Sequence, residues 1–246
     1  MSLQRIINVC ETLNIDRRKV VGVQYTRSEV AKVSETPTRN PWKFNLTISA
    51  ALQYGANRDL LEQIDYLDRR YAEVVSFGTA TGASAGLAYM FAYQGVMVKS
   101  QLDALNVVSF TGNQLTLNNL PTLAAIPGQA NGIMFKKGDF VQIGGYPYPF
   151  TIVGPAAVNG IVTPSDVYLR DAVISNGQPQ NLTLTVHRPN FIGTSVQGRG
   201  LNVGNACQFK MFCPNMPTYK LSPGGVNAII QWTSDFQLYE WTGDIL

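Results

Sequence analysis

The sequence predicts a mainly β protein with one packed helix, a long β-ribbon and a small β-barrel or sandwich module. Two observations lead to this class. Residues 41–49 alternate apolar and polar side chains without a break, which is typical of a strand with one buried face. Further along the chain, short apolar runs are separated at near-regular intervals by turns that contain Gly and Asn, a spacing typical of small barrels and sandwiches.

The first predicted element is the ribbon, which extends over residues 20–48. An apolar opening at residues 3–13, interpreted as strand or irregular chain, precedes it, and turn-forming residues 36–41 lead into its last strand. Long ribbons with polar faces are suited to assembly, because their edges can pair with another chain. We therefore expect an oligomerisation surface on the ribbon. Its candidate residues are Val21, Val23, Tyr25, Trp42, Phe44, Leu46 and Ile48.

The sequence predicts a helix over residues 57–71. Asn57 is the candidate N-cap, acidic residues occupy the first turns and arginines the last, an order that favours the helix dipole. Apolar residues recur at helical spacing and predict one buried stripe. Strands are predicted on the C-terminal side at residues 73–77 and 86–98. The stripe consists of Leu60, Leu61, Ile64, Leu67 and Tyr71.

The remaining chain predicts many short strands. Turn sequences such as Gly112-Asn113 and Gly144-Gly145 punctuate them, and Arg188-Pro189-Asn190 closes the barrel module. The strands predicted in the module are residues 103–110, 114–117, 139–143, 150–153, 167–169 and 182–186. Those predicted after it are residues 206–212, 219–221, 227–232 and 236–241.

Composition limits the function classes. Only 14% of the 246 residues are charged, and the net charge of +3 includes no basic run beyond Arg17-Arg18-Lys19. Sequence-specific binders of nucleic acid usually carry a basic stripe, so this class is disfavoured. A surface with little charge is less repelled by copies of itself and fits a protein that works inside an assembly. A second interpretation of this composition is a β-rich domain with many turns, which also explains the many Gly and Asn residues of the chain.

The three cysteines, Cys10, Cys207 and Cys213, are odd in number and lack the CxxC spacing. This pattern argues against a disulfide framework and a zinc site, and it predicts buried thiols, no metal and no cofactor. No signal peptide is recognised, and the most apolar stretch, residues 86–98, is too short for a membrane span.

Catalytic chemistry is not expected from the sequence. The single histidine, His187, ends an alternating strand, and we interpret it as structural rather than as a general base because a triad also needs a placed nucleophile and acid. The carboxylate pairs Asp65/Asp68 and Asp166/Asp171 could serve in glycoside hydrolysis, but the first lies beside arginines and indicates a solvated face. No catalytic residue is therefore predicted, and the chain is expected not to be an enzyme.

One aromatic cluster has two interpretations. Tyr146, Tyr148 and Phe150 alternate with prolines after Gly144-Gly145. Exposed on a β surface, such rings could stack on sugars, which would make the chain a carbohydrate-binding module that contacts host glycans. Packed inward, they would anchor the barrel core, as aromatics in turns rich in Pro and Gly commonly do.

The order of these segments resembles a known family. The ribbon ending in Trp42-Lys43-Phe44-Asn45-Leu46, the helix from Asn57-Arg58-Asp59 and the strand Val74-Val75-Ser76 resemble the tail-tube-like domain of bacteriophage tail-tip and baseplate hub proteins, including the distal tail proteins. The segment from Gly112-Asn113 to Val186-His187-Arg188-Pro189 looks like a small OB-like barrel inserted in such proteins. The segment from Met216 to Glu240 resembles the return to the first domain.

The resemblance implies a tail-tube-like β-sandwich at residues 1–98 and 191–246 with an inserted barrel at residues 99–190. It also implies a virion protein, assembled in the host cytoplasm, that forms a ring, commonly of six copies, around the tail channel. Its partners would be the tail tube and other baseplate proteins. DNA would pass through the channel without specific binding, and the barrel would hold a neighbour or a receptor-binding part.

Overall fold

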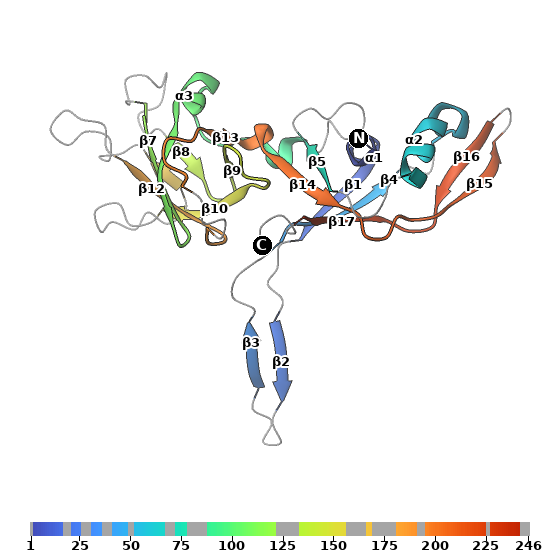
Figure 1. Cartoon of the computed structure of the whole chain (residues 1–246), viewed down its shortest axis with the longest axis horizontal. Coiled ribbons are helices and arrows are strands. Elements are labelled where there is room, and N and C mark those ends of the chain that lie inside the picture. The colour runs from blue at the N-terminus through green and yellow to red at the C-terminus, as the bar shows by residue number, and fades with distance from the viewer. Residues whose placement is uncertain are drawn as a thin grey trace. The chain divides into compact units, whose positions relative to one another are not determined.

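The protein is mainly β, as the sequence predicts (Figure 1). The computed structural model describes residues 2–16, 21–25, 31–35, 41–48, 52–66, 72–77, 88–121, 133–155, 166–168, 181–190, 195–224 and 227–241. No helix within these ranges is long and apolar enough to cross a membrane.

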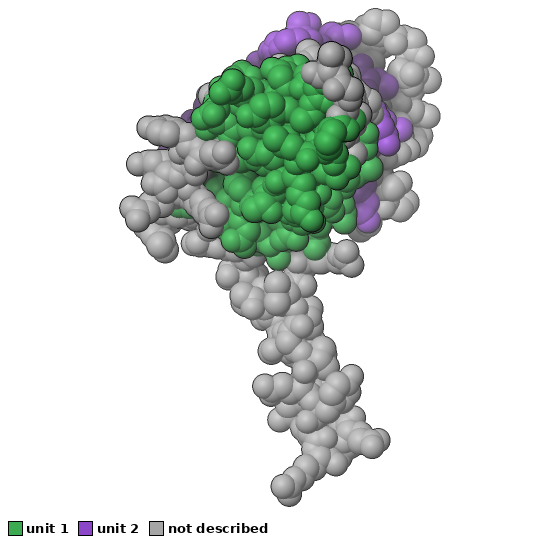
Figure 2. Space-filling view, turned by 90° about the vertical axis from the view of Figure 1, so that its right-hand side faces the viewer, with its two compact units in different colours: residues 1–73, 211–246 green, residues 74–210 purple. Residues whose placement is uncertain are grey.

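The chain forms two compact units. Unit 1 contains residues 1–73 and 211–246, and unit 2 contains residues 74–210 (Figure 2). Unit 1 is therefore built from two chain segments that enclose unit 2 in the sequence. The sequence analysis placed the corresponding boundaries after residues 98 and 190.

The main sheet of unit 1 brings together the two ends of the chain. Its order is β1-β4-β17-β14-β5. The two boundaries between the units, after Glu73 and after Lys210, fall within the strands β5 and β14. The alternation predicted for β4 is confirmed, because Trp42, Phe44, Leu46 and Ile48 are buried. The strands are β1 (Cys10–Asp16), β4 (Lys43–Ile48), β5 (Glu73–Ser76), β14 (Gln208–Phe212) and β17 (Phe236–Glu240).

The N-terminus is helical, where the sequence analysis expected strand or irregular chain. Helix α1 (Ser2–Asn8) buries Leu3, Ile6 and Ile7, whose spacing of three and four residues places them on one helical face. The apolar run at residues 3–13 is too short for its periodicity to distinguish a helix from a strand.

Helix α2 (Tyr54–Tyr66) begins three residues earlier than predicted. Leu60, Leu61 and Ile64 are buried, as predicted, while Leu67 and Tyr71 lie outside the described residues. The prediction that Asn57 caps the helix is wrong, because Asn57 lies within the first turns and donates from Nδ2 to Gln53 O at 2.9 Å.

The N-terminal cap of α2 comes from a distant strand instead. The backbone N–H of Gly55 donates to Oδ1 of Asn227 at 3.2 Å, and Asn227 begins strand β16 (Asn227–Trp232). This side chain satisfies one of the N–H groups that a helix leaves unpaired at its start.

Unit 1 also contains two separate two-stranded sheets. One pairs β2 (Val21–Tyr25) with β3 (Ala31–Glu35), and the other pairs β15 (Tyr219–Gly224) with β16. Helix α2 contacts β16. Residues 52–53 lie along β16, since Ile230 N donates to Leu52 O at 2.8 Å and Gln53 forms a bridge with Ile229.

Unit 2 is a curled antiparallel sheet with the order β13-β9-β10-β12-β7-β6. A bridge between Asn106 and Gly200 joins the start of β6 to the residue before β13, so the two ends of the sheet meet at this point. β11 (Asp166–Tyr168) and β8 (Ile133–Lys136) form a further pair. The six strands are β6 (Asn106–Thr111), β7 (Gln114–Asn118), β9 (Phe140–Ile143), β10 (Phe150–Pro155), β12 (Leu182–Val186) and β13 (Leu201–Val203).

Most strands of this unit were predicted, and the turn between β6 and β7 illustrates why. Thr111 pairs with Gln114 across a two-residue turn, and Gly112 has a φ of 57°. A positive φ at the first turn position suits the right-handed twist of a hairpin and favours glycine. Strands β8 and β13 were not predicted.

The strand predicted at residues 86–98 is wrong for its described part. Residues 88–91 form a turn of 3₁₀ helix, and Phe91 is buried against Phe77, Phe140 and Phe209 with ring centroids 4.3 to 5.6 Å apart. The apolar pattern therefore reflects packing into an aromatic cluster. The strand predicted at 103–110 is confirmed over residues 106–110, which belong to β6, while residues 103–104 end a short helix, α3 (Lys99–Ala104).

Replacing Asn227 by alanine should lower the free energy of unfolding by about 1 kcal/mol, because it removes the long-range cap of α2. The exposed Asn14 on β1 provides a matched control, and Asn14→Ala should change stability by less than about 0.5 kcal/mol. Urea unfolding of the full chain measures both. Equal effects of the two substitutions would contradict the capping role.

Candidate functional site

The last strand of the predicted ribbon lies inside the main sheet of unit 1. β4 pairs with β1 on one side and with β17 on the other. Trp42, Phe44 and Leu46 are at most 1% exposed, and Ile48 is 7% exposed. These four candidate residues therefore form core, and β4 has no open edge to offer to another chain.

The first part of the predicted ribbon forms the β2–β3 hairpin. The pairing register is regular over its whole length, from Val21 opposite Glu35 to Tyr25 opposite Ala31. It contains the other three candidate residues, Val21, Val23 and Tyr25. The hairpin forms a sheet of its own and does not extend the main sheet.

In the sequence, the hairpin lies between two paired strands of the main sheet. Strands β1 and β4, which precede and follow the hairpin in the sequence, pair with each other, and Asp16 lies opposite Lys43. The hairpin strands therefore belong to the stretch of sequence that connects β1 to β4.

The predicted aromatic platform is buried in unit 2. Tyr146 is 4% exposed, and Tyr148 and Phe150 are fully buried, with ring centroids 5.7 to 6.3 Å apart. The buried Arg188 guanidinium lies 4.0 Å from the centre of the Tyr148 ring, a cation–π contact. The three rings form core, as in the second interpretation of this cluster, and present no face on which a sugar could stack.

The single histidine has a structural contact. Nδ1 of His187 accepts a hydrogen bond from the Thr151 backbone N–H at 2.9 Å, which ties the end of β12 to β10. Of the carboxylates considered for acid–base chemistry, Asp65 belongs to α2 and Asp166 to β11, while Asp68 and Asp171 lie outside the described residues. Among the side chains that the structure describes, no group of three or more acidic, His or Cys residues is placed to hold a metal ion.

All three cysteines are buried and none forms a disulfide, as predicted. Burial raises the pKa of the Cys10 thiol to about 11 and also raises the pKa of Cys207. Because the thiolate is the reactive form, the raised pKa lowers the reactivity of these two thiols at neutral pH.

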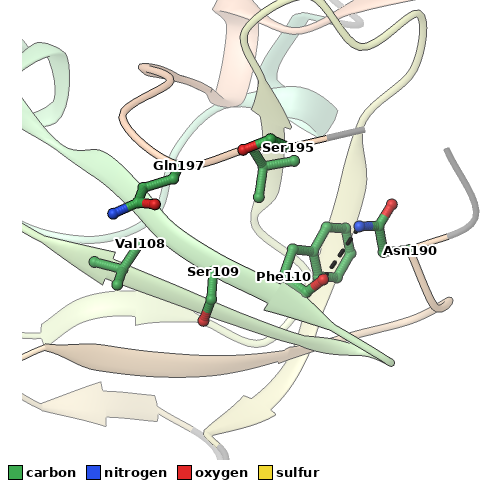
Figure 3. Close-up of a pocket in the computed structure, with 7 residues that line it drawn as sticks. Val108, Ser109, Phe110, Asn190, Ser195 and Gln197 are labelled. Atoms are coloured by element: carbon green, nitrogen blue, oxygen red, sulfur yellow. Dashed lines mark hydrogen bonds between the residues drawn. The ribbon is translucent and has the colours of Figure 1, made fainter. Parts of the chain in front are cut away.

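A polar pocket of about 350 Å³ lies along the edge of β6 in unit 2 (Figure 3). Asn190 closes one end of it, since its backbone N–H donates to Gly112 O at 2.7 Å and its Nδ2 donates to Phe110 O at 3.1 Å. Its Oδ1 accepts from the Tyr146 hydroxyl at 3.0 Å. Asn190 thus binds the Phe110 carbonyl of β6 and the Gly112 carbonyl of the turn that follows this strand. The lining residues are Val108, Ser109, Phe110, Asn190, Ser195, Val196 and Gln197.

Sequence reasoning did not identify the buried polar residues that hold unit 2 together. Gln142 donates from Nε2 to Tyr146 O and Gln208 O, and its Oε1 accepts from Gln208 N at 2.8 Å. Asp139 accepts from Gln94 N and Lys136 N. Gln94 and Gln208 lie 45 and 66 residues from their partners, and a local sequence pattern cannot reveal contacts over such a distance.

A comparison with protein-family models found no match, and a comparison with curated protein sequences found none either.

Tyr148→Ala should destabilise unit 2 by about 3–5 kcal/mol, because it leaves a cavity in the core and removes the ring beneath Arg188. Tyr89 is 70% exposed, and Tyr89→Ala should change stability by less than about 0.5 kcal/mol. Thermal unfolding of the two variants compares a buried and an exposed tyrosine directly. A stable Tyr148→Ala protein that has lost binding to a glycan array would instead support the platform interpretation.

Proposed function

We propose that the protein is a structural subunit of a bacteriophage tail, which forms a ring around the tail channel and connects the tail tube to baseplate or receptor-binding parts. The observation that carries the proposal is the β2–β3 hairpin. It is regular along its whole register, forms a two-stranded sheet of its own, and lies in the sequence between two paired strands of a larger sheet.

The residue types along the hairpin support an assembly role. Positions directly opposite each other lie on one side of a sheet, and successive positions alternate. By register, one set of alternating positions, here called the apolar row, has mostly apolar residues in the sequence, and the other set, the polar row, has mostly polar ones. The apolar row contains Val21, Val23, Tyr25, Ala31 and Val33 with Glu35 at its end, and the polar row contains Gly22, Gln24, Lys32 and Ser34.

An isolated two-stranded hairpin is at best marginally stable in water. Covering the apolar row would bury surface worth about 25 cal/mol per Å² and would supply the missing stability. A second copy of the chain is the cover in this proposal. Pairing that uses two different surfaces of each copy can close into a ring, and closure removes exposed edges.

The two-unit organisation also supports the proposal. Unit 1 would correspond to a tail-tube-like domain and unit 2 to an OB-like barrel inserted in it. The curled sheet of unit 2, whose ends meet at Asn106 and Gly200, is compatible with such a barrel. In the assembled tail, the barrel would hold a neighbouring subunit or a receptor-binding part.

The small number of charges fits dense packing of many copies. Charged residues make up 14% of the chain, against about 25% in typical globular proteins. In unit 2 the acidic residues are limited to Asp103, Asp139, Asp166 and Asp171. Weak repulsion between copies favours a ring, proposed to contain six, through which DNA passes without specific contacts.

Val23→Asp should abolish ring formation, because it places a charge in the apolar row. Gln24→Asp introduces the same charge on the polar row, beside Lys32, and should assemble like the wild type. Light scattering with negative-stain imaging of the same peak measures mass and shape. The proposal fails if the wild-type chain forms no ring, or if Val23→Asp forms the same rings as the wild type.

A further inference from the structure

The β15–β16 sheet has one covered edge and, within the described ranges, one open edge to which no strand is paired (Figure 1). The outer edge of β16 is covered by residues 52–53, through the hydrogen bond from Ile230 N to Leu52 O and the bridge from Gln53 to Ile229. In the part of the chain that the structure describes, β15 pairs with no strand other than β16. A strand from another molecule can therefore be added beside β15.

The open edge continues a buried apolar face. Leu221 on β15 lies opposite Ile230, which is fully buried, so the two residues share one side of the sheet. Leu221 itself is 46% exposed. Among the described large apolar residues of unit 1, it is the one most exposed to water. Tyr219 and Trp232 form the next pair on this side, with ring centroids 5.6 Å apart.

The other side of the β15–β16 sheet is polar at the open strand. Lys220 is exposed and Ser222 is half-buried, and both alternate with Leu221. β15 therefore has the same two-sided pattern as β2 and β3, over a strand of similar length. Edge-to-edge addition of the two hairpins would align apolar positions with apolar positions and polar positions with polar ones.

We infer that the β2–β3 hairpin of one copy adds to the edge of β15 in a second copy and forms a four-stranded sheet between the two molecules. This inference rests on the proposed function and names the surface that receives the hairpin. The added strand brings the apolar row of the hairpin beside Leu221, whose exposed flank becomes covered. Backbone hydrogen bonds supply the remaining affinity, as in other cases of strand addition.

Two features of the chain define the extent and the type of this contact. Pro223 has no N–H, so pairing is confined to residues 219–222 of the edge. The donor hairpin and the acceptor edge are different surfaces of the same chain, so the contact is heterologous and each copy can donate to one neighbour and accept from another.

A mixing experiment tests this arrangement. Val23→Asp damages only the donor, and Leu221→Asp damages only the acceptor, so each variant alone should remain a monomer. An equal mixture contains one intact junction, between the hairpin of Leu221→Asp and the β15 edge of Val23→Asp. The mixture should therefore form a dimer that contains one copy of each variant and cannot grow further. Native mass spectrometry with the Val23→Asp chain labelled with ¹⁵N identifies this dimer.

The outcomes separate the inference from the proposed function. Lys220→Asp is the control for folding and charge, because it places a carboxylate on the polar side of the same strand, and it should form rings. Rings that are lost with Val23→Asp but retained with Leu221→Asp would overturn the acceptor surface and leave the proposed function standing. A mixture that stays monomeric, although both variants melt cooperatively, would also overturn the inference.

Discussion

Unit 1 depends on one long-range strand pairing, between β4 near the start of the chain and β17 near its end. Trp42 N donates to the buried Glu240 carboxylate at 2.8 Å, and Glu240 N donates to Trp42 O at 2.9 Å. These residues are 198 positions apart. The main sheet is incomplete until the C-terminal segment returns, because β17 lies between β4 and β14. Such non-local pairing is slow to form, because the whole of unit 2 lies between the two segments in the sequence.

In the sequence, the hairpin strands β2 and β3 lie between β1 and β4, which pair with each other in the main sheet. The buried face of β4 stabilises unit 1. Among the described residues, β2 and β3 pair with no strand other than each other, and the proposed assembly role uses the edges that this pairing leaves.

The sequence predicted strands best where alternation and turn chemistry are local. The buried face of β4, the strands β7, β12 and β16, and the turn at Gly112 all followed from short patterns. The same alternation could not distinguish a central strand from a ribbon edge, because β1 and β17, which cover β4, come from distant segments. For the same reason Asn57 was taken as the helix cap instead of Asn227, which lies 172 residues from Gly55.

The candidate site was predicted only in part. Sequence patterns identified the hairpin, but burial decided the role of the aromatic cluster, since Tyr148 and Phe150 pack against Arg188 and each other. Burial of a ring depends on the closure of the whole sheet, and no local pattern encodes it. The open edge of β15 was also missed, because an edge is defined by the absence of a neighbouring strand in space.

The most direct test of the assembly role is amide hydrogen exchange at low and high protein concentration. The account expects the amides of residues 21–25 and 31–35 to become strongly protected as copies associate, while residues 182–186 in the unit 2 sheet keep their protection unchanged. Exchange in the hairpin that is independent of concentration, in a sample that light scattering shows to be assembled, would contradict it.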